Sequence, residues 1–178
     1  MSLIFDTHAH YDDEAFDADR ETLLASMPEH GVGLILDPGC DLGSSRRAVE
    51  LARTYPHVYA AVGWHPENCA PYTEDSLDAL RAWAREPKVV AIGEIGLDYY
   101  WEQNPPRELQ QRVLRDQLAL AQELGLPVIV HDREAHADSL AIVQEFPAVR
   151  GVFHCFSGSV EMARGNGDLL DLLNGLSG

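Results

Sequence analysis

Residues 3–10 of the chain read LIFDTHAH, a short apolar run followed directly by Asp6-Thr7-His8-Ala9-His10. An apolar run of this length predicts a β-strand. A doubly wound α/β sheet normally places a glycine-rich, phosphate-binding turn after its first strand, whereas this turn contains no glycine. The stretch therefore favours a barrel over an open, doubly wound sheet.

Beyond this stretch, apolar runs of strand length alternate with segments of helical periodicity. The predicted strands are residues 3–5, 33–36, 58–62, 89–92, 127–130 and 151–153, and the predicted helices are residues 14–27, 44–55, 74–86, 107–124 and 135–146. Ser44 is expected to be an N-cap and Gly125 a C-terminal stop. The strands are apolar almost throughout, which is typical of a parallel sheet covered by helices. We therefore expect an α/β fold of the (β/α)8 TIM-barrel type.

The chain holds fewer units than a full barrel. Such barrels usually need about 250 residues, and this chain has 178. We expect about six β/α units in an incomplete barrel over residues 1–164, with the C-terminal units missing or replaced by an atypical flexible or short helical tail over residues 165–178. The first and sixth strands would then be unpaired edges, which predicts a homo-oligomer formed through the open barrel edges.

The composition predicts one soluble globular domain, since 46% of the residues are hydrophobic and 24% are charged. No apolar run approaches the roughly 18 residues of a membrane helix, and the N-terminus does not have the pattern of a secretory leader. Three widely spaced cysteines indicate a reducing, cytoplasmic setting rather than a disulfide framework. The net charge of −16 argues against a broad duplex-binding face, so any chemistry on nucleic acid would be local and metal-assisted.

Residues of the types that bind metal ions follow every predicted strand. They are Asp6, His8, His10, Asp37, His65, Glu94, His131 and His154. Because the carboxyl ends of parallel strands share one edge, we expect a common site there. His8 and His10 are two residues apart, so an extended chain points both imidazoles the same way. Glu94 follows a buried strand, where its charge would be costly unless it were paired or bound to a cation.

This ligand set suits two divalent ions. Imidazoles with a carboxylate fit zinc, manganese, iron or magnesium, and the ligands are too many for one tetrahedral ion. Two ions about 3.5–4 Å apart, bridged by one carboxylate, would use them all, and Glu94 is the natural bridge. Asp37-Pro38-Gly39 is typical of a turn, so Asp37 is placed outside the set. The remaining histidines are assigned to surface or helix positions: His30, His57 and His136.

Three further features each allow two interpretations. Arg133 lies two residues after His131 and either offers a planar fork to a phosphate or pairs with Asp132 or Glu134. The segment 157–159, Ser-Gly-Ser, either opens a helix whose N–H groups face an anion or is a plain N-cap and turn. Aromatic residues beside the strand ends either stack on nucleic-acid bases or pack against helices: Trp64, Tyr99, Tyr100 and Trp101.

Five motifs, in order and spacing, identify a family resemblance: FDTHAH (5–10), GWHPE (63–67), AIGEIGLDYYW (91–101), LGLPVIVHDR (124–133) and GVFHCFSGS (151–159). From Leu3 to about Arg164 the chain resembles the TatD-type metal-dependent deoxyribonucleases, within the wider amidohydrolase-like barrels. The resemblance implies a TIM-type barrel that hydrolyses DNA phosphodiester bonds, often as a 3′-to-5′ exonuclease on single strands or ends, with magnesium, manganese or zinc. From the apolar pattern we expect no membrane partner.

Carried onto this sequence, the resemblance implies two metal sites that share one carboxylate: His8, His10 and Glu94 for the first, and Glu94, His131 and His154 for the second. Glu94 would also hold the nucleophilic water. His65 would hold the scissile phosphate, and Arg133 would help to place it.

The chain departs from the family in one respect. The family places a further metal-binding Asp at the end of an eighth strand, in a segment similar to ETDSP, and this sequence has no such segment. We therefore expect metal binding with little nuclease turnover, unless Asp168 or Asp171 folds back over the barrel mouth or the sequence is part of a longer chain.

Two other functions stay open. One is an amidohydrolase acting on a small amide or ester, although such barrels commonly carry a modified Lys where this chain has Glu94. The other is a noncatalytic, metal-binding barrel fragment that self-associates.

Overall fold

The computed structural model describes residues 3–160 and Ala163, and the structural statements below refer to that part of the chain. These residues form one parallel sheet in the order β1-β2-β3-β4-β5-β6, so each strand pairs with its neighbours in sequence. The strands are β1 (Ile4–Asp6), β2 (Val32–Pro38), β3 (Val58–Val62), β4 (Val89–Asp98), β5 (Val128–Arg133) and β6 (Gly151–Phe153).

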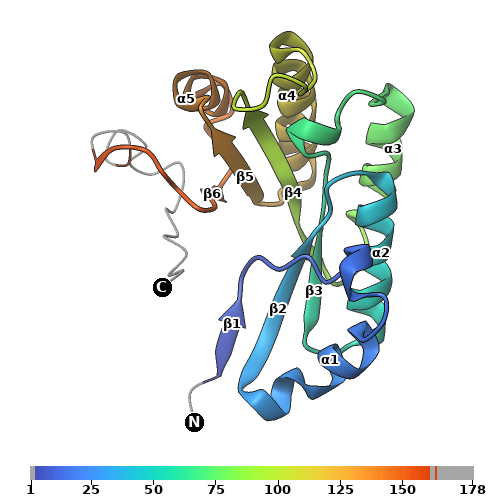
Figure 1. Cartoon of the computed structure of the whole chain (residues 1–178). Helices are drawn as coiled ribbons and strands as arrows, with labels where there is room; N and C mark the ends of the chain where they lie inside the picture. The colour runs from blue at the N-terminus through green and yellow to red at the C-terminus, as the bar shows by residue number, and fades with distance from the viewer. Residues whose placement is uncertain (1–2, 161–162, 164–178) are drawn as a thin grey trace.

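Helices connect the strands and cover one side of the sheet. The α-helices are α1 (Arg20–Ser26), α2 (Leu42–Thr54), α3 (Glu74–Trp83), α4 (Arg107–Leu124) and α5 (His136–Gln144), and short 3-10 turns span Glu14–Phe16, Met27–His30 and Pro66–Asn68. Figure 1 shows the sheet curling, with α2 and α3 along the outside of β2 and β3. The described residues therefore form a curled half-barrel of the TIM-barrel type, which confirms the predicted fold class.

The predicted helix boundaries differ in accuracy. Helix α4 has the predicted bounds, and Gly125 ends it in the left-handed conformation with φ 66°. The predicted helix over 14–27 is wrong as one element, because a 3-10 turn and α1 divide it. Arg20 donates to the carbonyl oxygens of Tyr11 and Asp13, which ties the preceding loop to the start of α1.

The predicted N-cap of α2 is also wrong. The cap residue is Asp41, whose carboxylate accepts a hydrogen bond of 2.8 Å from the Ser44 N–H. Asp37 does not lie in a turn, because Asp37 and Pro38 end β2 and pair with Ala60 and Ala61 of β3. Local turn chemistry was outweighed there by pairing with the neighbouring strand.

Strand β4 is longer than predicted, and its extension carries the residues of the site. Gly96 adopts φ 141°, and a Cβ atom there would lie 1.9 Å from the carbonyl oxygen of His131. Only glycine fits this close approach of β4 to β5. The extension reaches Asp98, which pairs with Arg133 in the β4–β5 ladder.

The main core lies between the sheet and its helices. Its fully buried members include Leu24, Ile35, Leu80, Ile92, Ile95, Leu97, Leu114, Leu118, Leu120 and Phe153. Each such side chain contributes roughly 1.5–3 kcal/mol through burial. A smaller cluster of buried residues lies apart from the main core: Leu36, Ala61, Ala91 and Ile129. The strands are therefore held firmly, and their carboxyl ends form a stable edge.

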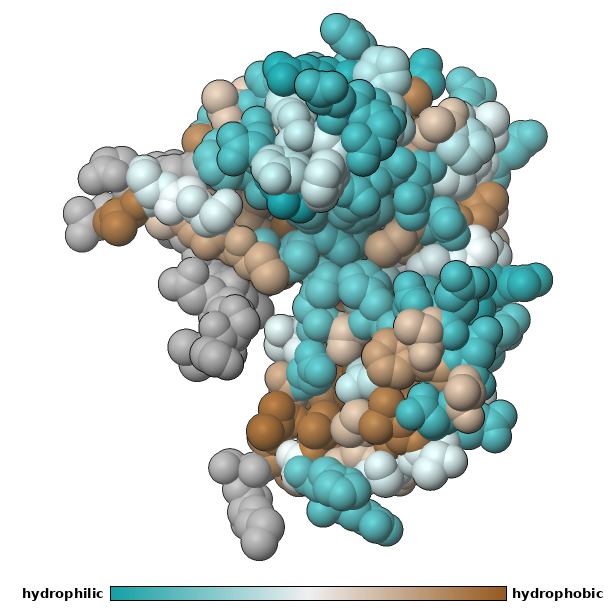
Figure 2. Space-filling model, in the orientation of Figure 1, coloured by the Kyte–Doolittle hydropathy of each residue, from teal (hydrophilic) through white to brown (hydrophobic). Residues whose placement is uncertain are grey.

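Strand β1 is an exposed edge that pairs only with β2 among the described strands. Leu3, Ile4 and Phe5 are 67%, 61% and 50% exposed, and Leu34 of β2 is 40% exposed. Figure 2 shows hydrophobic surface gathered at this end of the molecule. The helices of the described part include none long and apolar enough to cross a membrane. The predictions for residues 165–178, including Asp168 and Asp171, lie outside the described residues.

Candidate metal centre

Glu94 lies at the carboxyl edge of the sheet, with its side chain only 4% exposed. Its Oε2 atom lies 3.2 Å from Nε2 of His8 and 3.5 Å from Nε2 of His10. Both histidines come from the loop after β1, and their Nε2 atoms are 3.1 Å apart. The structure therefore directs two imidazole nitrogens and one carboxylate oxygen at a common point, an arrangement that could hold a cation.

The other carboxylate oxygen of Glu94 faces a second group of histidines. Its Oε1 atom lies 3.2 Å from Nδ1 of His131 and 3.7 Å from Nε2 of His65, and it contacts Nε2 of His154. These rings come from β5 and from the loops after β3 and β6. The structure thus brings together all five candidate ligands and His65, with a different oxygen of Glu94 facing each group.

Burial and the surrounding rings set the charges of this cluster. Burial alone would raise the pKa of Glu94, but the contacts with the surrounding histidines hold it well below its usual range. Burial lowers the pKa of His8. The buried Nδ1 atoms of His8 and His154 have no hydrogen-bond partner among the described residues, whereas their Nε2 atoms face the Glu94 carboxylate. Imidazole nitrogens directed at one ionised carboxylate fit a divalent cation, because imidazole and carboxylate are its common ligands.

Two carboxylates lie behind His10, on the side away from Glu94. Nδ1 of His10 is 3.8 Å from Oδ1 of Asp12, and both groups form a cluster with Asp37. Burial disfavours the charged ring, but the contacts with Asp12, Cys40 and Glu94 outweigh it and raise the pKa of His10 to about 12. Burial and the neighbouring Asp12 raise the pKa of Asp37 to about 9. Asp37 therefore keeps its proton at neutral pH.

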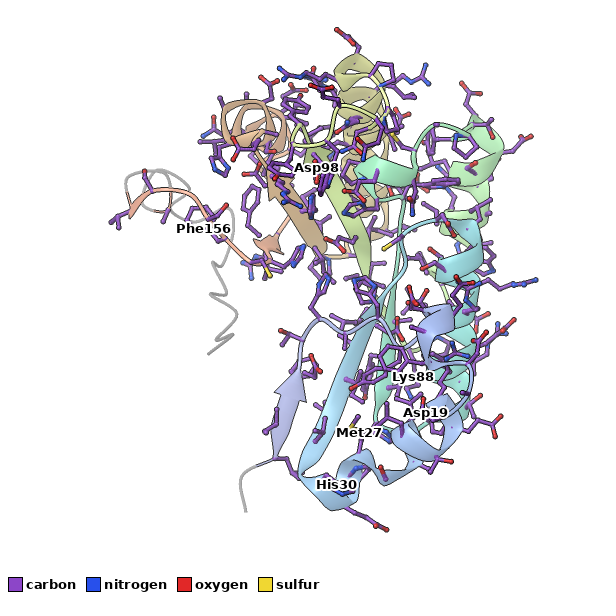
Figure 3. The ribbon with its side chains drawn as sticks, viewed as in Figure 1. Asp19, Met27, His30, Lys88, Asp98 and Phe156 are labelled. Atoms are coloured by element: carbon purple, nitrogen blue, oxygen red, sulfur yellow. The ribbon has the colours of Figure 1, made fainter. Side chains whose placement is uncertain are left out.

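Asp98 is a residue of the site that the sequence interpretation missed. It is fully buried at the end of β4 (Figure 3), and its Oδ2 lies 3.0 Å from Nε2 of His131. Its Oδ1 accepts hydrogen bonds of 3.0 Å from the Tyr100 N–H and from Nδ2 of Asn104. A signal was present in the sequence, because residues 94 and 98 are four apart and an even spacing in a strand points both side chains to the same face.

His65 is held as a neutral hydrogen-bond donor. Burial lowers its pKa to about 4, so the ring is uncharged at neutral pH. The Glu67 N–H donates to Nδ1 of His65 over 3.3 Å, which leaves the ring proton on Nε2. The Nε2–H group therefore points into the cluster as a donor, and His65 also forms with Glu94 and His131 a group that could hold a metal ion.

Arg133 lies beside the cluster and does not form the ion pairs that were one alternative for it. Asp132 is occupied by His136, 2.6 Å away, and by the hydroxyl of Ser139. The guanidinium of Arg133 lies over the ring of Tyr100, 3.8 Å from its centroid. The Arg133 side chain therefore rests on an aromatic face at the rim of the site.

The four candidate aromatic residues divide into two pairs. Trp64 is buried, and the hydroxyl of Tyr99 donates to Asp138 over 2.9 Å, so these two pack within the fold. Tyr100 and Trp101 are 50% and 43% exposed. The helix that would follow Ser159 lies largely outside the described residues, so the anion site predicted there stays a prediction.

A surface cavity opens next to His10. It has a volume of about 490 Å³. Its lining comes from the segment after β1, from the residues between β2 and α2 and the start of α2, and from the 3-10 turn after β3, and it includes His10, Asp12, Phe16, Cys40 and Arg47. The side chain of His10 is 36% exposed. Solvent-borne molecules can therefore reach the edge of the centre although Glu94 is buried.

The curled parallel sheet and the histidine-ringed carboxylate at its carboxyl edge define the class: a β/α-barrel protein with a candidate metal centre. Residues 5–178 match the family described as TatD related DNase. The chain belongs to this family, as the motifs indicated.

Individual relatives agree with this placement. The chain is 42% identical over 164 residues to the uncharacterized metal-dependent hydrolase YabD of Bacillus subtilis, which covers 91% of this chain and 64% of the relative. It is 38% identical over 163 residues to the 3′-5′ ssDNA/RNA exonuclease TatD of Cronobacter turicensis, covering 90% of this chain and 62% of the relative. The chain thus spans less than two thirds of the length of these curated relatives.

A solved structure shows the same fold. The TatD homologue YjjV of Escherichia coli superposes with a TM-score of 0.85 at 36% sequence identity, covering 95% of this chain and 66% of that chain.

Proposed function

We propose that this chain contributes the metal centre of a hydrolase that cleaves phosphodiester bonds in single-stranded nucleic acid, DNA in the first place. One observation carries the proposal: the two oxygens of buried Glu94 face two separate groups of histidines. A carboxylate that bridges two ligand groups is the arrangement of two-metal phosphoesterases. Relatives named as a metal-dependent hydrolase and as an ssDNA/RNA exonuclease support the same chemistry.

The residues fit two divalent ions. His8 and His10 with Oε2 of Glu94 would hold one ion, and His131 and His154 with Oε1 would hold the other. Magnesium, manganese or zinc bound there would supply Lewis-acid polarisation of a phosphate and would acidify a water molecule. The buried carboxylate would contribute negative charge to both sites if ions were bound there.

Two more side chains would act on the phosphate. The Nε2–H group of His65 is a neutral donor aimed into the cluster. The guanidinium of Arg133 brings a permanent positive charge to a chain with net charge −16. A neutral donor and a cation would together orient a phosphodiester and partly neutralise it.

The test is hydrolysis of a labelled single strand by the metal-loaded chain. The protein is loaded with manganese, its metal content is measured, and it is incubated with a ten-nucleotide DNA strand labelled at its 5′ end. We expect slow shortening from the 3′ end, because the sequence has no segment similar to the one that carries the family's further metal-binding Asp. Glu94→Gln should abolish it, because the amide loses the charge and one of the two bridging oxygens. Arg46→Gln, an exposed substitution on α2, is the matched control and should cleave as the unsubstituted chain does.

The outcomes separate the alternatives. A chain that holds manganese and leaves the strand intact refutes phosphodiester hydrolysis and favours the noncatalytic metal-binding function. Hydrolysis of p-nitrophenyl acetate or of a cyclic amide, with the strand intact, favours the amidohydrolase. Strand cleavage that persists in Glu94→Gln would place the reaction at another site.

A further inference from the structure

The loop after β4 presents two exposed aromatic rings next to the candidate metal centre. The rings of Tyr100 and Trp101 have centroids 4.6 Å apart and cross at 86°. The guanidinium of Arg133 lies 3.8 Å from the Tyr100 centroid and 5.4 Å from the Trp101 centroid. Two large aromatic side chains exposed beside each other offer ring faces on which a planar ligand can stack.

This aromatic group is attached to the centre through Asp98. One carboxylate oxygen of Asp98 contacts His131, and the other accepts the Tyr100 N–H, each over 3.0 Å. Arg133 pairs with Asp98 in the sheet, and its carbonyl oxygen accepts the Tyr99 N–H over 2.9 Å. The loop is therefore fixed relative to a histidine of the centre by one shared carboxylate and one backbone bond.

The Arg133 side chain is held over the Tyr100 ring, but its N–H groups have no hydrogen-bond partner among the described residues. Within the described part of the chain, it forms neither an ion pair nor a side-chain hydrogen bond; its guanidinium carbon lies over the Tyr100 ring and farther from the Trp101 ring. Stacking uses the flat face of a guanidinium and leaves its N–H donors free around the rim. A phosphate bound by those donors would therefore lie beside an exposed indole ring.

We propose that Tyr100, Trp101 and Arg133 form a nucleotide subsite, in which Trp101 stacks on a base and Arg133 binds an adjoining phosphate of the same strand. The inference rests on the proposed function, because it gives the substrate of that centre a place to bind. A flat ring beside a cation matches the two parts of a nucleotide, a planar base and an anionic phosphate. Stacking on Trp101 would tolerate any base, since every base has an aromatic face.

The indole N–H signals of the chain allow a direct test. The sequence has three tryptophans, and Trp64 and Trp83 lie elsewhere in the fold, so they serve as internal controls. The ¹⁵N-labelled chain of 178 residues is titrated in magnesium buffer with a thymidine hexamer and with an abasic hexamer of equal charge, and strand length is checked afterwards. We expect the Trp101 signal alone to shift, with binding of the abasic hexamer weaker by about tenfold.

Substitutions separate base recognition from phosphate recognition. Trp101→Ala should remove the preference for the base-containing hexamer, and Trp101→Phe should retain most of it. Arg133→Ala should weaken binding of both hexamers by a similar factor, whereas Arg46→Ala, with the same loss of charge on α2, should weaken neither. A uridine hexamer run in parallel distinguishes RNA from DNA as the source of the nucleotide.

The proposal fails if the two hexamers bind equally well to the unsubstituted chain, if neither binds, or if Trp101→Ala keeps the preference. A Trp101→Ala variant that loses thermal stability and affinity for both hexamers alike would show a structural role instead. Failure of the proposed hydrolase function can be told apart from failure of the subsite. In that case the chain would still prefer the base-containing hexamer, but the metal-loaded protein would leave the strand uncut.

Discussion

Replacing Asp98 by Asn should weaken one of the two proposed metal sites and spare the other. Oδ1 of Asp98 accepts N–H groups from Tyr100 and Asn104, so this position must remain an oxygen. The new amide NH₂ then faces Nε2 of His131, in the place where Oδ2 had accepted a hydrogen bond of 3.0 Å from this ring. The ring proton must move to Nδ1, the atom 3.2 Å from Glu94. His131 thereby loses the lone pair that it would offer to the second ion.

The expected loss of metal affinity can be taken from carboxylates that hydrogen-bond to metal-binding histidines in other proteins. Loss of such a partner typically costs 10- to 100-fold in metal affinity, or about 1.4–2.7 kcal/mol. Titration with manganese against a competing chelator should show one site weakened by this factor and the other unchanged. The ¹⁵N shifts of the His131 ring should show the proton moving from Nε2 to Nδ1.

A neighbouring carboxylate provides the control. The side chain of Asp132 is only 4% exposed, but it contacts His136 and Ser139 on the side of α5. Asp132→Asn should therefore bind both ions as the unsubstituted chain does. The reasoning is refuted if Asp98→Asn folds normally and binds both ions with unchanged affinity.

Three further predictions concern stability and association. The folded-state pKa of Asp37, about 9, lies above its ordinary value of 3.8, so folding retains a proton and this group destabilises the fold increasingly as pH rises between those values. In urea unfolding with EDTA, Asp37→Asn should raise the free energy of unfolding, and this gain should grow from pH 5 to pH 8 by at most about 1.4 kcal/mol per pH unit. The reasoning is contradicted if the free energies of the variant and of the unsubstituted chain change with pH in parallel. Lys88, labelled in Figure 3, donates to three carbonyl oxygens at the C-terminal end of α2 over 2.5–3.2 Å. Lys88→Met should therefore lower the free energy of unfolding by about 1–2 kcal/mol. An unchanged midpoint of urea unfolding would count against this stabilising role. Phe5 lies exposed on the edge strand β1 and should support self-association. Phe5→Lys should therefore shift the sedimentation profile at high micromolar concentration toward monomer. A monomeric profile of the unsubstituted chain would exclude association through this edge.

Much of the architecture followed from local pattern. Apolar runs bounded by helical periodicity predicted the alternation of strands and helices, and α4 with its stop at Gly125 matches the predicted bounds. The parallel arrangement also explains why His8, Glu94 and His131, far apart in sequence, lie at one edge of the sheet. The type of each residue and the end of each strand can be recognised from a short segment of sequence, because hydrophobic periodicity indicates which residues of that segment are buried.

Only the tertiary structure decided how the side chains meet. The length of β4, the placement of Asp37 in β2 and the support of His131 by Asp98 depend on pairing between strands that are distant in sequence. The same holds for Arg133. The sequence allowed either a phosphate or an acidic neighbour as its partner, and the fold places its guanidinium over the ring of Tyr100. Sequence periodicity gives the face on which a side chain lies, whereas its partner depends on register and on packing across the sheet, which no local segment encodes.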